Sequence, residues 1–500
     1  MAATTGSFDL HDLTVALLVG SLVLVVAVAA VRLSVRSGLP SLLLYLGIGV
    51  ALGEDGLGLR FDDAVLTQVL GYAALVLILA EGGLGTRWEA IRPSVLPAVV
   101  LSTVGVVVSV GVVALACHWL LGLRWATALL LGAILASTDA AAVFSVLRRV
   151  PLPRAVTGML EAEAGFNDAP VVILVTALAA VQAHGGELFW PTLALVAALE
   201  LAGGAAIGVA VGLGGGWLMR RLASGSSGLF SIGVLAVIVL AYAVAASAHA
   251  SGFIACYLAA LVLGNLRLPH QGAVHGFSQA LGWLAQIGLF VLLGLLASPR
   301  GMVDQLVPAL VIGTVLLLVA RPASVMVSLS PFRLPRRIQL FLSWAGLRGA
   351  VPVVLATVPM TQGSHASEWI FDLVFLLVVI FTLVQAPTLP WVARRLRVTE
   401  EGHAHDLGLD ATVLDELGAA VLEVRVGESS RLHGVEVHEL RLPPEAVVTL
   451  VVREGRSLVP DPRTILRHGD QLLVVAPEAV REAAQERIRQ VSLEGRLAGW

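Results

Sequence analysis

One carboxylate in an apolar stretch constrains this chain more than any other feature. Residues 156–181 are hydrophobic enough to cross a bilayer, yet they carry Asn167 and Asp168 near the middle. An ionised Asp at the centre of a membrane is costly, so such residues are rare and usually mark an ion pathway or a proton relay. Other charged residues lie deep in apolar sequence as well, namely Asp139, Glu163 and Arg348.

The composition excludes a soluble protein. Of the 500 residues, 57% are hydrophobic and only 13% are charged, and the mean hydropathy is +0.89. These values are typical of a polytopic membrane protein. The first thirteen residues lack a basic region and a cleavage pattern, so we expect the first apolar run to be a retained helix. Cys117 and Cys256 lie in separate apolar runs without metal-ligand spacing, so we expect neither a disulfide framework nor a metal site there.

Hydropathy predicts an all-α membrane part, residues 1–397, with about thirteen transmembrane helices. The apolar runs lie near 13–31, 39–53, 64–80, 94–116, 125–147, 156–181, 190–219, 229–249, 252–266, 277–297, 303–322, 337–358 and 369–393. Arginines cluster in alternate connections, at 32–36, 87–92, 148–154, 220–221, 267, 333–337 and 394–397. By the positive-inside rule, the N-terminus is expected outside and the C-terminus in the cytoplasm.

The last hundred residues differ in composition from the membrane part. A polar linker, 398–415, precedes a predicted small cytosolic α+β domain, 416–490, and a short tail, 491–500. Strand-like runs at 420–426, 446–452 and 471–476 are separated by turn signals, and a charged helix is expected from 476 to 490. Because no GxGxxG pattern occurs in this region, a dinucleotide-binding Rossmann half is not supported.

The deep charges are predicted to meet at one level of the membrane. At about 1.5 Å per residue, Asp168 lies roughly 20 Å from the cytoplasmic end of the sixth helix. The same count places Asp139 in the fifth helix at similar depth and Arg348 in the twelfth slightly shallower. Small and polar residues flank Asp139, and Gly349 and Pro352 follow Arg348, so helices five and twelve are predicted to be broken, as in inverted-repeat transporters.

Helical spacing suggests roles for these groups. Glu163 and Asn167 are four residues apart and share a face, whereas Asp168 is turned about 100° from Asn167. We therefore expect Glu163 to hold Arg348 in a structural ion pair while Asp168 faces a cavity together with Asp139. A carboxylate in a half-dry cavity favours its protonated form, and can exchange that proton for a cation.

Three separated motifs resemble the monovalent cation:proton antiporter-1 family, in particular its NhaP-type potassium/proton branch associated with cell-volume regulation. The motifs are STDAAAVFSVL around Asp139, the E-x-x-x-N-D pattern that ends in Asp168, and GLRGAVPVVLA around Arg348. The resemblance implies thirteen helices in two inverted six-helix repeats, a homodimer, and an elevator-like movement of a core domain. It also implies that the Asp168 and Asp139 carboxylates and the Thr138 carbonyl bind the cation, with Asn167 and the pair of Glu163 and Arg348 in support.

Two details refine the expected transport. Many members of this family carry Ser after the first Glu of the second motif, where the hydroxyl can ligate the ion, but this chain has Ala164, so its cation affinity or selectivity is expected to differ. The Asn-Asp pair resembles electroneutral members, which implies that one cation replaces one proton.

The tail resembles the TrkA-C lobe of domains that regulate potassium conductance. Its turns carry Gly434, Arg453, Pro460, Gly469 and Asp470. In relatives such lobes dimerise and some bind a cyclic dinucleotide, so a nucleotide effector on this domain is a hypothesis. The resemblance favours K⁺ over Na⁺ as the substrate.

We therefore predict a K⁺/H⁺ or Na⁺/H⁺ antiporter in a bacterial inner membrane, in contact with lipid, with no enzymatic activity, cofactor or nucleic-acid partner. A regulated K⁺ channel is the alternative, although no TVGYG-like filter occurs. An intramembrane aspartyl protease that uses Asp139 and Asp168 ranks lower, because it leaves Glu163 and Arg348 unexplained. The half-deep Glu200 is expected to line a dimer interface or to face water, and Glu81 to cap or snorkel at a helix end.

Overall fold

The computed structural model describes residues 10–37, 40–59, 61–139, 143, 150, 152–184, 189–222, 226–363, 368–399, 405–406, 419–427, 430–453 and 456–495. Within these ranges, nine helices are long and apolar enough to cross a membrane. Four shorter apolar helices accompany them, at Ser41–Leu52, Trp125–Ile134, Gly252–Asn265 and Ala350–Thr361. The polytopic helical architecture is confirmed, whereas the count of thirteen and the sidedness stay predictions.

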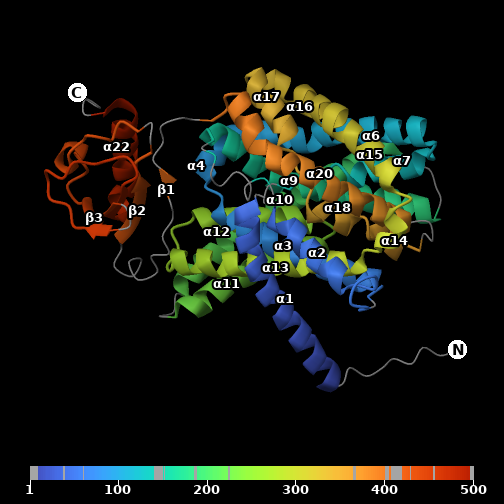
Figure 1. Cartoon of the computed structure of the whole chain (residues 1–500). Coiled ribbons are helices and arrows are strands. Elements are labelled where there is room, and N and C mark those ends of the chain that lie inside the picture. Colours follow the sequence, from blue (N-terminus) through green and yellow to red (C-terminus); the bar gives the residue numbers. More distant parts are fainter. Residues whose placement is uncertain are drawn as a thin grey trace.

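The helices form two groups, which lie one above the other in Figure 1. In the first group, α3 and α13 pack on each other, and α2, α10, α11 and α12 pack around them. Its elements are α1 (Leu10–Ser37), α2 (Ser41–Leu52), α3 (Ala64–Gly85), α10 (Trp190–Arg221), α11 (Ser227–Ser247), α12 (Gly252–Asn265) and α13 (Gln271–Leu296). Glycines permit close helix packing in this group, since a Cβ on Gly208 of α10 would lie 2.5 Å from the Ala255 carbonyl oxygen of α12.

The second group contains the helices that carry the deep charges. It begins with α4 (Trp88–Ile91), α5 (Val95–Val100), α6 (Val106–Leu121), α7 (Trp125–Ile134) and α9 (Arg154–His184). It continues with α14 (Pro299–Met302), α15 (Leu306–Val315), α16 (Arg321–Leu329), α17 (Arg336–Trp344), α18 (Ala350–Leu355), α19 (Val358–Thr361) and α20 (Glu368–Arg395). Contacts of α9 and α18 with α3 join the two groups.

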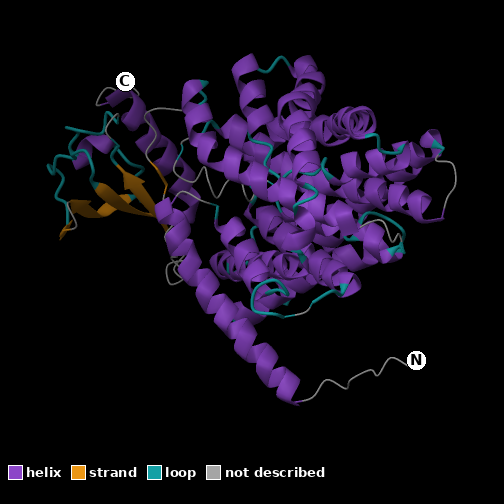
Figure 2. Ribbon diagram, turned by 45° about the vertical axis from the view of Figure 1, so that its right-hand side comes forward, coloured by secondary structure: helices purple, strands orange, loops and turns teal. Residues whose placement is uncertain are grey.

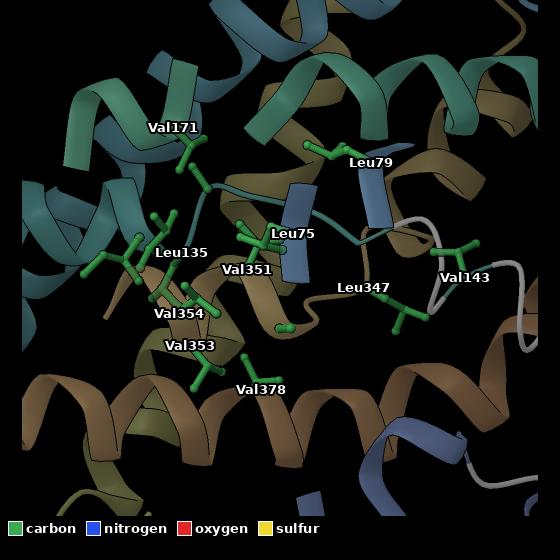
Figure 3. Packing of buried hydrophobic residues seen from close by; sticks show 14 of the residues in the cluster. Leu75, Leu79, Leu135, Val143, Val171, Leu347, Val351, Val353, Val354 and Val378 are labelled. Carbon is green, nitrogen blue, oxygen red and sulfur yellow. The ribbon is translucent and has the colours of Figure 1, made fainter. Parts of the chain in front are cut away.

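Non-helical backbone lies at both predicted helix breaks. α7 ends at Ile134 and residues 137–139 are not helical, while α17 ends at Trp344 and residues 346–349 are not helical before α18; most of residues 140–149, after the first break, lie outside the described residues. The two non-helical segments touch, because the Asp139 backbone N–H donates to the Leu347 carbonyl at 2.8 Å. Figure 3 shows Leu347 beyond the end of α18, whose Val351 lies beside Leu75 of α3. Unwound backbone at this depth is stable only because protein surrounds it.

The order of features before each break occurs twice. A π-helical turn, η2 (Leu101–Gly105), joins α5 to α6 before the break after α7, and η3 (Leu316–Ala320) joins α15 to α16 before the break after α17. This recurrence agrees with two repeats. It also corrects one boundary, since the helix expected to end near 322 continues through Leu329. Arg321 therefore lies inside the bundle rather than at a helix end.

The C-terminal part forms the predicted α+β domain, and Figure 2 shows its strands beside the helical part. Its elements are β1 (His405–Asp406), β2 (Ala419–Arg425), β3 (Val447–Arg453), β4 (Arg456–Leu458), β5 (Gln471–Pro477) and α22 (Arg481–Glu494). The strand order is β1-β2-β5-β3-β4 and every pairing is antiparallel. α22 runs past residue 490, where the short tail was expected to begin. Most of the expected linker, 398–415, lies outside the described residues.

Arg453 and Asp470 lie side by side at one end of this sheet, where β3 ends and β5 begins. The Arg453 guanidinium donates to both carboxylate oxygens of Asp470, at 2.8 and 2.7 Å. Asp470 is fully buried. Its position follows Gly469, whose φ of +85° is a conformation that favours glycine. The pair therefore holds the turn that leads into β5.

Candidate ion-binding site

Asp139 lies on the non-helical segment after α7, at the point where the two breaks cross. Its backbone N–H is fixed by the Leu347 carbonyl. Its side chain packs against Gly349, because a Cβ built on Gly349 would lie 1.6 Å from Asp139 Oδ2. Glycine at this position thus makes the room that the carboxylate occupies.

Asp168 approaches the same place from the middle of α9. Its side chain is 8% exposed, and its Oδ1 accepts a hydrogen bond of 2.7 Å from the Ser137 hydroxyl. Ser137 belongs to the non-helical segment that also carries Asp139. Ser137 was not among the expected site residues, although it lies in the first motif. The break therefore supplies Asp168 with a donor that an unbroken helix would direct elsewhere.

The expected pair of Glu163 and Arg348 is wrong: Arg321 is the partner of Glu163. The Arg321 guanidinium contacts both carboxylate oxygens, with Nη1 at 2.6 Å from Oε1 and Nη2 at 2.9 Å from Oε2. Both side chains are nearly completely buried. The reason is that the helix after η3 continues, so Arg321 projects into the bundle at the level of Glu163. A planar guanidinium suits this two-point contact.

Arg348 is buried as well, but no carboxylate of the described residues pairs with it. Its Nη1 donates to the Gly346 carbonyl at 3.4 Å, and its Nε has no partner among those residues. Its own carbonyl accepts a hydrogen bond from Thr382 of α20 at 3.1 Å. Gln385, one turn further along α20, donates to the Trp344 carbonyl at 3.0 Å. α20 thus satisfies carbonyl groups that the second break frees.

Asn167 and Thr138 link the ion pair to the break. Asn167 Nδ2 donates to the Thr138 hydroxyl at 3.0 Å, and that hydroxyl donates to Glu163 Oε1 at 3.1 Å. The Thr138 side chain is therefore engaged in structure. Its carbonyl oxygen accepts no hydrogen bond from the described part of the chain. This arrangement leaves the carbonyl, rather than the hydroxyl, available to a ligand.

A cavity of about 340 Å³ opens between the two helix groups. Thr138, Asp139 and Asp168 line it together. Glu81 of α3 also lines it, which differs from the expected helix-end role. Ala164, where the resembling family often has Ser, lies on the same wall one turn from Asp168. Glu200 does not line this cavity; its backbone carbonyl accepts from the Ser251 N–H.

This geometry suits a cation with few ligands from the protein. Two carboxylates and the Thr138 carbonyl form a hard oxygen set, which binds alkali cations better than softer ions. The cavity leaves room for water to complete the coordination shell. Burial favours the neutral form of a carboxyl and a bound cation favours the ionised form, so cation and proton compete for the same group. The site is thus chemically able to exchange one for the other.

Comparisons with known proteins agree with this reading. Residues 21–395 match the family described as sodium/hydrogen exchanger, transmembrane, and residues 421–489 match the TrkA-C domain.

Among curated proteins, the K⁺/H⁺ antiporter NhaP of Alkalimonas amylolytica is 37% identical over 480 residues, which cover 94% of this chain and 82% of that one. The K⁺/H⁺ antiporter NhaP2 of Shewanella oneidensis is 36% identical over 481 residues, covering 95% and 83%. The Na⁺/H⁺ antiporter NhaS2 of Synechocystis is 26% identical over 78% of this chain and 73% of its own length. Among solved structures, the sodium proton antiporter MjNhaP1 from Methanocaldococcus jannaschii superimposes with a TM-score of 0.67 at 20% identity, over 78% of this chain and all of that one.

Proposed function

The chain belongs to the sodium/hydrogen exchanger family, and from this premise we propose that it exchanges a monovalent cation, K⁺ or Na⁺, for H⁺ across a bacterial inner membrane. K⁺ is the favoured cation, since the two K⁺/H⁺ antiporters above resemble it over more than nine-tenths of its length. The TrkA-C match supports a regulatory role for the tail, with a small ligand such as a cyclic dinucleotide. The protein is proposed to act as a homodimer with its C-terminus in the cytoplasm.

One observation carries this proposal: Asp139 and Asp168 line one cavity at the crossing of two broken helices. In the proposed cycle, Asp168 binds either the cation or the proton. Asp139 and the Thr138 carbonyl complete the cation's shell. The pair of Glu163 and Arg321 stays closed and fixes the α9 scaffold.

Net neutrality of the exchange follows from the use of a single exchanging carboxylate. If Asp168 releases one proton for each cation that it binds, the two half-cycles carry the same charge. Movement of the second group of helices, which carries the deep charges, against the first group would then open the site to each side of the membrane in turn. The K⁺ and H⁺ gradients across the membrane would set the direction in which cytoplasmic K⁺ is exchanged for external H⁺.

The test is cation-dependent proton movement in everted vesicles or proteoliposomes, with K⁺, Na⁺ and Li⁺ added separately. Wild-type protein is expected to move protons in response to K⁺ without creating a membrane potential, and Asp168→Asn to abolish the response. Asp304→Asn, in an exposed loop, is the matched control and is expected to behave as wild type. Cation flux without coupled proton movement would refute exchange and favour a channel.

A further inference from the structure

The wall of the cavity continues from Asp168 along one face of α9. Residues at spacings of three and four lie on the same helix face, and Glu161, Ala164, Gly165 and Asp168 all line the cavity. Glu161 is two turns, or roughly 10 Å, from Asp168 along the helix axis. It is partly exposed and forms no ion pair or hydrogen bond with the described residues. The exchange mechanism above leaves this carboxylate unused.

Tyr257 of α12 faces the stretch between the two carboxylates. The tip of its ring packs on Gly165, since a Cβ there would lie 2.1 Å from Tyr257 Cζ. The edge of Phe166 meets the same ring at a centroid distance of 5.6 Å, which fixes its orientation. Glu161 is near enough for its charge to act on the phenol group. The phenol therefore lies between Glu161 and Asp168 on the cavity wall.

The Tyr257 hydroxyl is a buried polar group whose hydrogen-bonding capacity the described residues do not fill. The side chain is 2% exposed, and no described residue forms a hydrogen bond with the hydroxyl. The nearby Thr86 hydroxyl donates to the Gly82 carbonyl at 2.7 Å, and it interacts with the Tyr257 hydroxyl without a hydrogen bond of normal geometry. Buried hydroxyl groups are normally hydrogen-bonded, and one that lines a cavity with so weak a protein contact points to a ligand or an ordered water.

We propose that Glu161 and Tyr257 form a waiting site for a partly hydrated monovalent cation on the route to Asp168. The inference rests on the proposed exchange function and adds a second binding position to it. The Glu161 carboxylate would supply charge, the Tyr257 hydroxyl oxygen would supply one neutral ligand, and water would fill the remaining positions. Ala164 is small, so the wall between the two positions leaves a path for the ion beside the Tyr257 ring.

The waiting site predicts a change in apparent affinity rather than loss of exchange. Removing a unit charge about 10 Å from the transport carboxylates, at an effective dielectric constant of about 20, changes cation binding by on the order of tenfold. In everted vesicles, Glu161→Gln is therefore expected to raise the half-saturating K⁺ concentration about tenfold while the maximal rate stays within about twofold. Tyr257→Phe is expected to raise it about threefold, as loss of one neutral ligand would.

Non-additivity tests the shared ion. If both groups hold one cation, the double variant is expected to resemble Glu161→Gln alone, whereas independent effects would multiply. Glu161→Asp, which keeps the charge, should restore most of the affinity. Glu200→Gln, a partly exposed membrane carboxylate outside the cavity, is the matched control and should leave K⁺ affinity unchanged.

The outcomes separate this inference from the proposed function. Wild-type exchange with an unchanged half-saturating K⁺ concentration in Glu161→Gln would overturn the waiting site alone, and multiplied effects in the double variant would overturn the shared ion. A change in the pH profile at saturating K⁺, without a change in K⁺ affinity, would make Glu161 a proton relay and would also overturn it. Should Glu161→Gln fail to reach the membrane, Tyr257→Phe decides by the same readout. Absence of exchange in wild type would refute the proposed function first.

Discussion

Replacing Arg321 by Met is expected to destabilise this protein far more than replacing Arg348 by Met. Arg321 contacts both oxygens of Glu163, at 2.6 and 2.9 Å, and the Glu163 side chain is only 3% exposed. Arg321→Met leaves that carboxylate buried without its partner, which costs about 3–5 kcal/mol. Arg348 has no carboxylate partner among the described residues, so Arg348→Met removes a buried charge at a cost of about 1 kcal/mol or less.

A double-mutant cycle isolates the pair. Glu163→Gln removes the charge of the partner while its side-chain oxygen can still accept from the Thr138 hydroxyl. Arg321→Met combined with Glu163→Gln is therefore expected to be less destabilised than the sum of the two single variants, by roughly 2–3 kcal/mol. A smaller coupling is expected between Glu163→Gln and Arg348→Met, because Arg348 interacts with Glu163 only through its charge and not through a direct ion pair.

The assay is thermal unfolding of the purified full-length protein in mild detergent, followed by tryptophan fluorescence, with all variants in one buffer. Arg321→Met should unfold several degrees below wild type and Arg348→Met close to it. Equal losses for the two arginine variants would refute the reasoning, as would strict additivity of Arg321→Met with Glu163→Gln. Equal losses would mean that Glu163 can pair with either Arg321 or Arg348.

Three further outcomes follow from the geometry. Gly349→Ala is expected to lower the exchange rate on the order of 100-fold, because a Cβ 1.6 Å from Asp139 Oδ2 forces that carboxylate to move; vesicle assays measure it. Ala164→Ser, which adds a hydroxyl to the cavity wall, is expected to change cation affinity a few-fold and to shift the K⁺/Na⁺ ratio, measured as half-saturating concentrations. In the tail, burial by itself would raise the pKa of Asp470, but hydrogen bonds and charge from Arg453 outweigh it and the pKa is lowered. The stabilisation is therefore complete above the unfolded value of about 3.9 and is lost as pH falls through the lower folded value, which hydrogen exchange of β5 in the full chain would report.

Each of these has a control and a contrary result. Gly111→Ala, where an added Cβ meets nothing within 4 Å, should leave exchange intact, and wild-type activity in Gly349→Ala would contradict the packing. Unchanged affinities and selectivity in Ala164→Ser would remove that position from the ion path. Replacing Asp470 by Asn should flatten the acid dependence of β5 protection; the same acid dependence in wild type and variant would assign it to other groups.

The helix breaks could be predicted from the sequence because their cause is local. Gly and Pro interrupt the helix near Arg348, and small polar residues precede Asp139, so unwound backbone at those points follows from chain chemistry. The strands of the tail were readable for the same reason, since alternating β-branched residues end at turn signals. The depth count also brought Asp139 and Asp168 together correctly, because both line one cavity.

The ion-pair partner of Glu163 could not be predicted from the sequence. Hydropathy ended the eleventh helix near 322 and placed Arg321 at its boundary. The polar Ser324 and Ser328 beyond that point are buried, and the Ser324 hydroxyl donates to the Gly105 carbonyl of η2. Hydropathy places a helix end from the composition of a short stretch of sequence. Whether a residue there is buried depends on which neighbouring helix packs against it.

By itself, the sequence determined that this chain crosses a membrane many times, that two helices break where charges meet, and that an antiparallel domain follows. These properties depend on local backbone preferences and on the cost of exposing apolar or charged groups to the wrong solvent. The tertiary structure alone decided the pairing of Arg321 with Glu163, the donor that Ser137 gives to Asp168, and the place of Tyr257 on the cavity wall. Each of these joins residues from different helices, and the rotation and register of packed helices are set by side-chain packing over the whole bundle rather than by any one segment.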